Sequence, residues 1–292
     1  MSGCTLCPRK CGVDRSVQRG FCGVPGKPVV ARAALHFFEE PCISGTRGSG
    51  AVFFCGCNLR CAFCQNKTIS RGAGGQEITP ERLRKIYEEL IAQGAHNINL
   101  VTPTPFADVV AQSLEGGLPV PVVWNCGGYE SVETLRMLEG KIQIYLPDFK
   151  YADASLAARY SAAPDYPGVA QAALQEMVRQ TGDYAANADG ILQRGVLIRH
   201  LVLPGNLANT FGVIDCVRRL FPRDGQILFS LMSQYTPVVR LPQFPELCRR
   251  LTQTEYDAAE QYLFDSGIED GFVQDLQSAE ADYIPAFDGT GV

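Results

Sequence analysis

The sequence lacks the features that mark several classes of protein. None of its apolar stretches approaches the roughly 18–20 residues that a membrane-spanning helix needs, so we expect no membrane segment. Its start has no apolar core of a secretory signal, which favours a cytoplasmic protein. Basic residues are not in excess, since 26 Lys and Arg face 31 Asp and Glu, so nucleic acid is not an expected partner. Hydrophobic residues make up 46% of the chain, which excludes a disordered protein.

Cysteine, by contrast, is abundant. The chain has 12 cysteines in 292 residues, or about 4%. This share is below the roughly 8–10% of cysteine that marks a disulfide scaffold. Nine of the 12 precede residue 65. In a reducing compartment, clustered cysteines are more often metal ligands or catalytic thiols than disulfides. We therefore expect metal binding near the start of the chain.

From about residue 50 onward, strand-like and helix-like segments alternate. Short β-branched and aromatic runs, several of them apolar on both faces, predict buried parallel strands. The predicted strands are Val52–Phe54, Ile98–Val101, Val122–Trp124, Ile142–Leu146, Val196–Leu203 and Ile227–Met232. Helices are predicted from Pro80 to Gly94, at Ser131–Glu139, Ala154–Ala162, Tyr166–Thr181 and Asn209–Leu220, and from a capping box at Thr252 to Gly267. This pattern indicates an α/β fold, and we favour a partial (β/α)6 barrel over an open sheet.

The ends of the chain depart from this alternation. Residues 1–45 are interpreted as a small cysteine-rich, metal-binding extension, and residues 46–292 as the barrel with a C-terminal tail. The tail after Gly271 carries Phe272, Tyr283, Ile284 and Phe287, which are too apolar for a free end. We expect it to pack over the barrel.

The central motif is Cys57-Asn-Leu-Arg-Cys61-Ala-Phe-Cys64, directly after the first strand of the βα series. Three thiolates on one tight loop can hold three irons of a cubane [4Fe–4S] cluster. Structural zinc sites close with four ligands, whereas three cysteines leave one metal position open for chemistry. Cys55 is a candidate fourth ligand without an assured place at the cluster. The alternative is a zinc-dependent binding module in which four of these cysteines hold a structural ion.

This motif resembles the radical S-adenosylmethionine (SAM) superfamily, and more narrowly an uncharacterised branch related to pyruvate formate-lyase activating enzyme. The resemblance covers almost the whole chain. Besides the motif it includes Cys4–Arg15, Val30–His36, Tyr145–Lys150, Arg199–Gly205 and Ser230–Tyr235.

The resemblance implies an enzyme that cleaves SAM reductively. Cys57, Cys61 and Cys64 would bind the cluster, and SAM would bind its remaining iron. One electron, from a donor such as flavodoxin or ferredoxin, would give a 5′-deoxyadenosyl radical that abstracts a hydrogen atom. The substrate class stays open between a glycyl radical protein, which the enzyme would activate, and a small molecule or peptide.

Several further residues are candidates for the SAM site. Asp148 and Lys150 lie two residues apart at the end of a predicted strand, so their side chains share a face. The resemblance implies that Asp148 is the acid that binds the ribose hydroxyls and that Lys150 is the cation that binds the carboxylate of SAM. The alternative for this pair is a surface salt bridge. Arg199 would be an inward charge, which is costly unless paired. The resemblance and the positions after the strands add Asn66, Thr102, Asn125 and Gln234.

A second group of cysteines precedes the central motif. Cys4, Cys7, Cys11 and Cys22 have the spacing C-x2-C-x3-C-x10-C, and prolines and glycines among them allow tight turns. Four ligands in so short a segment fit tetrahedral zinc or a second [4Fe–4S] cluster. The alternative is free cysteines in a flexible arm.

Overall fold

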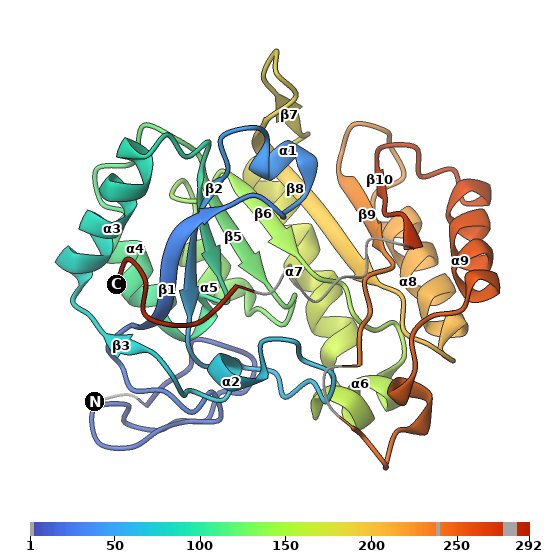
Figure 1. Ribbon diagram of the computed structural model, residues 1–292, viewed down its shortest axis with the longest axis horizontal. Coiled ribbons are helices and arrows are strands. Elements are labelled where there is room, and N and C mark those ends of the chain that lie inside the picture. Colours follow the sequence, from blue (N-terminus) through green and yellow to red (C-terminus); the bar gives the residue numbers. More distant parts are fainter. Residues whose placement is uncertain (1–2, 238–239, 277–284) are drawn as a thin grey trace.

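The computed structural model describes residues 3–237, 240–276 and 285–292, which are organised by a curved, largely parallel sheet (Figure 1). The strand order is β10-β9-β8-β6-β5-β4-β2-β1-β3. The six predicted strands run parallel to one another in it: β2 (Ser49–Phe54), β4 (Ile98–Val101), β5 (Val122–Cys126), β6 (Ile144–Pro147), β8 (Leu192–Leu201) and β9 (Leu228–Met232). The prediction of an α/β partial barrel is therefore confirmed.

Further strands extend this sheet beyond the prediction. β1 (Val29–His36) runs antiparallel to β2 and is followed at the edge by β3 (Gln76–Glu77). At the other edge, β10 (Gly271–Val273) lies parallel to β9. The short β7 (Ala185–Ala186) pairs with β8. No strand was predicted at Val29–His36, so the first strand of the sheet begins inside the segment interpreted as the cysteine-rich extension.

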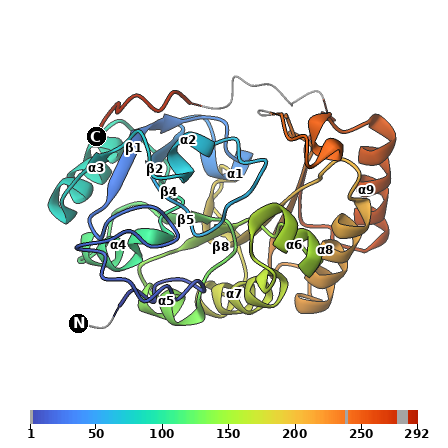
Figure 2. The ribbon, with the colours of Figure 1, turned by 90° about the horizontal axis from the view of Figure 1, so that it is seen from below.

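The helices that connect the parallel strands lie along the outer side of the curved sheet (Figure 2). They are α3 (Pro80–Ala92), α4 (Ala107–Ser113), α5 (Val132–Met137), α6 (Ala154–Ser161), α7 (Tyr166–Thr181), α8 (Leu207–Leu220) and α9 (Gln253–Asp265). Thr79 caps α3, and Thr252 forms the predicted capping box of α9 with Glu255. Helix α4 and the 3-10 turn before it (η1, Thr104–Phe106) were not predicted.

A short helix closes one end of the barrel. In α1 (Pro41–Ser44), Cys42 and Ile43 pack inside the barrel against residues of four strands. These residues are Val123, Ile144, Leu146, Leu192, Leu197 and Leu228. The larger core lies between the sheet and the outer helices. Helix α1, with Cys42 and Ile43, is here called the α1 plug. It fills one end of the barrel interior, so the rest of the interior is lined by other side chains.

The C-terminal tail returns to the far edge of the sheet. The amide of Ala33 donates to the carbonyl of Thr290 at 2.8 Å, and Arg32 forms an ion pair with Asp288 at 3.0 Å. The ring of Phe287 packs edge-on against Phe53, so the prediction that Phe287 packs on the barrel is confirmed. Tyr283 and Ile284 lie outside the described residues.

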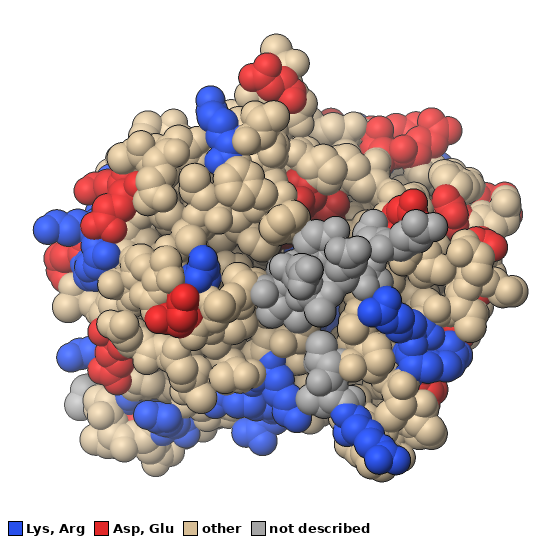
Figure 3. Space-filling view, viewed as in Figure 1, with Lys and Arg blue, Asp and Glu red and all other residues tan. Residues whose placement is uncertain are grey.

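Residues 3–28, here called the N-terminal arm, contain no helix or strand and pack against the loop that carries the central motif. Arg9 Nε donates to the carbonyl of Asn58 at 2.9 Å, and its guanidinium lies 3.9 Å from the ring centre of Phe21. The arm also reaches α5, where Thr134 Oγ1 donates to the carbonyl of Leu6 at 2.7 Å. Figure 3 shows Lys and Arg side chains along this lower edge of the molecule, near α2 (Lys67–Ser70).

Candidate functional site

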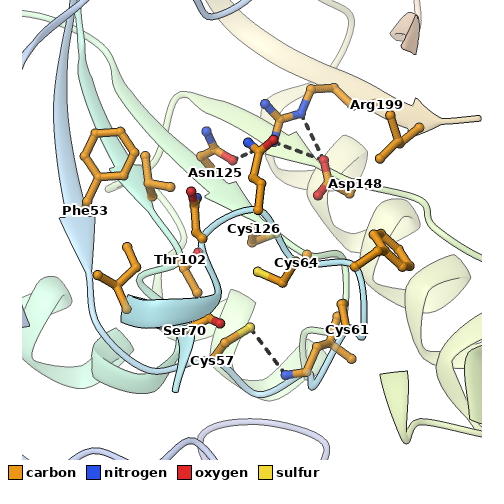
Figure 4. A pocket seen from close by; sticks show the side chains of 18 of the residues that line it. Phe53, Cys57, Cys61, Cys64, Ser70, Thr102, Asn125, Cys126, Asp148 and Arg199 are labelled. Atoms are coloured by element: carbon orange, nitrogen blue, oxygen red, sulfur yellow. Dashed lines mark hydrogen bonds and ion pairs between the residues drawn. The ribbon is translucent and has the colours of Figure 1, made fainter. Parts of the chain in front are cut away.

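Three strands each turn a polar side chain into the barrel beyond the α1 plug. Side chains two apart on a strand share a face. The residues two places beyond the plug-facing positions of β5, β6 and β8 are Asn125, Asp148 and Arg199. All three line one pocket of about 250 Å³ (Figure 4). The alternation of the strands thus places a polar layer on top of an apolar one.

The charges in this layer form a continuous network. Asp148 is contacted on one carboxylate oxygen by Lys150 Nζ at 2.6 Å and on the other by Arg199 Nε at 3.0 Å. Burial alone would raise the pKa of Asp148, but the two cations outweigh it and lower that pKa. Asp148 is therefore held as a carboxylate, and the expected shared face of Asp148 and Lys150 is present.

Glu39 joins the network from outside the parallel strands. It follows β1, and one of its oxygens accepts from Arg199 at 2.9 Å. The other oxygen accepts from Asn125 at 3.0 Å and from Asn99 at 3.2 Å. Arg199 also donates to Asn125 Oδ1 at 2.7 Å. Glu39 could not be recognised from the sequence alone, because nothing near it in sequence shows that it meets Arg199.

The central cysteines lie across the pocket from Arg199 (Figure 4). Residues 57–64, here called the cysteine loop, contribute Cys57, Cys61 and Cys64 to the pocket wall. The amide of Leu59 donates to Cys57 Sγ at 3.4 Å, and Ser161 Oγ donates to Cys61 Sγ at 3.0 Å. Burial raises the pKa of Cys57 and of Cys61, and nearby Lys150 opposes this for Cys61. Bound metal cations would stabilise these thiols as thiolates.

The pocket gathers the other candidates for the SAM site as well. Its lining includes Asn66, Thr102 and Gln234 beside the residues already described. Two buried polar atoms of the lining, Asn66 Oδ1 and Thr236 Oγ1, have no hydrogen-bond partner among the described residues. Because buried polar groups normally have a partner, these two atoms fit a site that is completed by a polar ligand.

The spacing of the thiols bears on which metal group they fit. Among the described residues, no three Cys, His, Asp or Glu side chains stand close enough to hold a single metal ion. In a cubane cluster, each cysteine binds a different iron, so its ligands need not converge on one point. Three cysteines of one loop, with hydrogen-bond donors at two sulfurs, fit such a cluster better than a structural zinc ion.

The cysteines of the N-terminal arm are only partly brought together. Cys7 is near Cys4 and Cys22, and burial raises its pKa to about 12. The amide of Cys4 donates to the carbonyl of Val13 at 2.9 Å, and this hydrogen bond folds the arm back on itself. Cys11 is exposed. A metal site in the arm, with zinc or a second cluster, stays a prediction.

Four further features lie partly outside and partly inside the pocket. Cys55, the possible fourth ligand, is buried and has its thiol near the carbonyl of Ala73 at 3.5 Å. His200, next to Arg199 in sequence, is buried in the core. His36, at the end of β1, lines the pocket next to Phe53. The Asn125-Cys-Gly-Gly turn does reach the pocket through Asn125, Cys126 and Gly127.

Comparison with known proteins identifies the family. Residues 51–144 match the model of the radical SAM superfamily. An uncharacterised protein of Methanocaldococcus jannaschii, MJ0674, is 30% identical over 267 residues, which cover 88% of this chain and 72% of the relative. The chain therefore belongs to the radical SAM superfamily. It is an enzyme of that class, for which the family implies a [4Fe–4S] cluster, SAM and a source of electrons.

A solved structure shares this fold. The structure of Streptococcus suis SuiB bound to the precursor peptide SuiA aligns with a TM-score of 0.53 at 12% identity, over 76% of this chain. This chain spans 48% of the length of that protein. A domain of pyruvate-formate lyase-activating enzyme from Bacteroides vulgatus aligns with a TM-score of 0.37 at 14% identity, over 67% of this chain and 91% of the domain.

Within the described parts of the chain, no helix has both the length and the apolar character that crossing a membrane requires.

Proposed function

We propose that Cys57, Cys61 and Cys64 hold the [4Fe–4S] cluster and that SAM binds beside it in the pocket. The observation that carries this proposal is that the cysteine loop and the network around Asp148 line the same pocket, although they come from distant parts of the chain. When bound and reduced, the cluster supplies the electron that breaks the sulfur–C5′ bond of SAM, which yields methionine and a 5′-deoxyadenosyl radical for hydrogen abstraction.

The residues of the pocket have distinct tasks in this proposal. Lys150 offers an ammonium group to the carboxylate of SAM, and Asp148 accepts hydrogen bonds from ribose hydroxyls. Arg199 keeps Asp148 ionised and oriented through a contact of 3.0 Å. Asn66 Oδ1, which has no partner among the described residues, accepts a hydrogen bond from the cofactor. When SAM, a zwitterionic ligand, binds, these groups would replace part of their contacts with one another by contacts with the ligand.

The substrate class is inferred from the sequence resemblance. The segments Cys4–Arg15, Tyr145–Lys150 and Ser230–Tyr235 resemble a branch related to pyruvate formate-lyase activating enzyme. An activating enzyme of that kind abstracts hydrogen from a glycyl residue of a partner protein. We therefore propose activation of a glycyl radical protein as the function.

The cluster assignment predicts that the cysteine loop acts as a unit. Replacing Cys57, Cys61 or Cys64 with Ala removes one iron ligand, so each variant should lose the electron paramagnetic resonance signal of the reduced cluster and the formation of 5′-deoxyadenosine. Cys55→Ala is the matched control and should keep both. Circular dichroism checks that the barrel is folded in all four variants. A variant at position 57, 61 or 64 with unchanged turnover would show that the ligand set is wrong.

The substrate is tested separately by isotope transfer. Candidate glycyl radical proteins, labelled with α-deuterated glycine, are incubated with the reconstituted enzyme, SAM and reductant. Deuterium in 5′-deoxyadenosine supports glycyl activation. SAM cleavage without deuterium transfer from any such protein, but with transfer from a labelled small molecule, would overturn that part and leave the radical chemistry intact.

A further inference from the structure

We propose that the outer surface of the cysteine loop is a docking site for an acidic electron-donor protein. This inference rests on the proposed function, because it names the partner that supplies electrons to the same site. The surface is formed by the arm, the cysteine loop and α2. Four of its exposed cations, Arg19, Arg60, Lys67 and Arg71, are here called the basic face.

The charges of the chain are divided very unevenly along the sequence. Residues 1–75 hold ten Lys and Arg against three Asp and Glu, whereas residues 76–292 hold 16 against 28. The first part therefore carries a net charge of +7, and the rest carries −12. The arm, the cysteine loop and α2 all belong to the positive part.

Contacts with one segment of the arm bring the basic face together. Arg60 donates to the carbonyl of Phe21 at 3.4 Å and stacks over its ring at 4.3 Å. Arg19 donates to the carbonyl of Gly23 at 3.4 Å. The backbone of Gly23 packs against the end of α2, where Arg71 lies, and Lys67 is one helical turn before it.

The positive charge of this face is not neutralised within the chain. None of the four cations forms an ion pair with an acidic side chain of the described residues, whereas some exposed cations elsewhere, such as Arg179 and Arg249, do. Figure 3 shows blue side chains gathered near α2 along the lower edge. Unpaired charges of one sign steer an oppositely charged partner toward the surface that carries them.

The place of the basic face indicates which partner it fits. Arg60 lies within the cysteine loop, and α2 begins three residues after Cys64. A protein seated here comes close to the cluster from outside and does not need to enter the pocket. That is the requirement for electron transfer, in which the donor loses one electron, the cluster gains one, and no bond forms or breaks. A substrate, in contrast, has to reach the pocket itself.

The test compares two double charge reversals that change the net charge equally. Arg19→Glu with Arg71→Glu alters the basic face, and Lys85→Glu with Arg194→Glu alters exposed cations on α3 and β8. Stopped-flow measurements follow reduction of the cluster by a reduced flavodoxin, an acidic FMN protein, and by dithionite. We expect the first variant to be reduced by flavodoxin at least about tenfold more slowly and the control variant within about twofold of the unaltered protein. Dithionite should reduce all three proteins at similar rates.

Salt dependence provides a second measurement that needs no variant. Reduction of the unaltered enzyme by flavodoxin should slow as ionic strength rises, because salt screens the attraction. Equal flavodoxin rates in both variants, or a flat salt dependence, would overturn the docking site. Failure of dithionite to support SAM cleavage in the unaltered enzyme would instead overturn the proposed function. Binding of an oligonucleotide that depends on Arg19 and Arg71, with donor reduction unchanged, would show a nucleic-acid surface and overturn the inference.

Discussion

Glu39 supplies the pocket with a negative charge that the parallel strands do not carry. Its carboxylate accepts from Arg199, Asn125 and Asn99 at once, so it holds both an amide and a guanidinium in place. The side chain is 11% exposed, so these contacts are poorly screened by solvent. Glu39 therefore acts on the SAM site through Arg199 and is best described as a positioning residue.

We predict that Glu39→Gln weakens SAM binding. With the charge removed, Arg199 turns more fully to Asp148 and competes with Lys150 for it. Breaking a buried ion pair commonly costs about 3–5 kcal/mol, and since Asp148 still balances Arg199 we expect a stability loss of about 2 kcal/mol. The dissociation constant of SAM, measured anaerobically by calorimetry, should rise about tenfold. Glu40→Gln, whose parent carboxylate accepts from Ser230 at 2.8 Å, is the control. Equal SAM affinity in both variants would contradict the positioning role.

His200 makes stability depend on pH in the acid range. The ring is buried between the carbonyl of Phe149 at 2.7 Å and Thr210 Oγ1 at 3.0 Å. Burial lowers its pKa to about 4, whereas the unfolded chain has a value near 6.5. Between these two pKa values the unfolded chain binds more protons than the folded chain. The contribution of His200 to the free energy of unfolding is therefore fully present above about pH 6.5 and is lost as the pH falls toward 4. The loss should reach about 3 kcal/mol.

Urea unfolding at pH 7 and at pH 4.5 checks this expectation. His200→Gln should show a smaller difference between the two pH values than the unaltered chain. His96→Gln, which removes a half-buried histidine hydrogen-bonded to Arg47, should keep most of the difference. An unchanged pH dependence in His200→Gln would show that His200 is not the titrating group.

At the scale of elements, the turn after β5 determines where the end of β6 lies. Gly128 has φ +75°, and a Cβ added there would lie 2.2 Å from the carbonyl oxygen of Asp148. At Gly128 the close approach is to the protein backbone, whereas Gly127 lines the pocket.

We predict that Gly128→Ala displaces Asp148 and weakens SAM binding at least about tenfold. Gly140→Ala is the matched control, because Gly140 has φ +78° and nothing within 4 Å of an added Cβ. The control should show only the cost of a left-handed alanine, about 1–2 kcal/mol of stability. If the two variants bind SAM equally well, the contact with Asp148 has no influence on the site.

The elements that could be predicted are those whose own residues determine them. The strand at Ile98–Val101 is a short apolar run, and α3 has its cap and its amphipathic spacing in sequence. β1 was missed because Arg32 interrupts it and because its pairing with β2 decides its conformation. The same holds in the site. Asp148 and Lys150 could be paired from their spacing, whereas Glu39 and His36 depend on a fold that brings residues far apart in sequence into one pocket.

At the scale of the whole molecule, we predict two separate metal sites. A variant with Cys57, Cys61 and Cys64 all replaced by Ala should still contain zinc or iron, held by Cys4, Cys7, Cys11 and Cys22, because a short arm buries little apolar surface and a metal would stabilise it. Metal analysis with sulfide determination distinguishes zinc from a second cluster. Adding Cys4→Ala and Cys7→Ala should remove the remaining metal. If the triple variant contains neither metal, the arm has no site.

The ion pair of Glu39 with Arg199 also has a consequence for how the barrel folds. The two residues are 160 positions apart in sequence, and in the folded chain each is the other's buried counter-charge. A chain that has formed β1 to β6 but not β8 has no guanidinium for Glu39, and desolvating that lone carboxylate would be costly. Partly folded barrels that lack β8 are therefore destabilised by the unpaired carboxylate at their centre. We expect the barrel to assemble cooperatively, at a rate set by the slow search that closes this long-range contact.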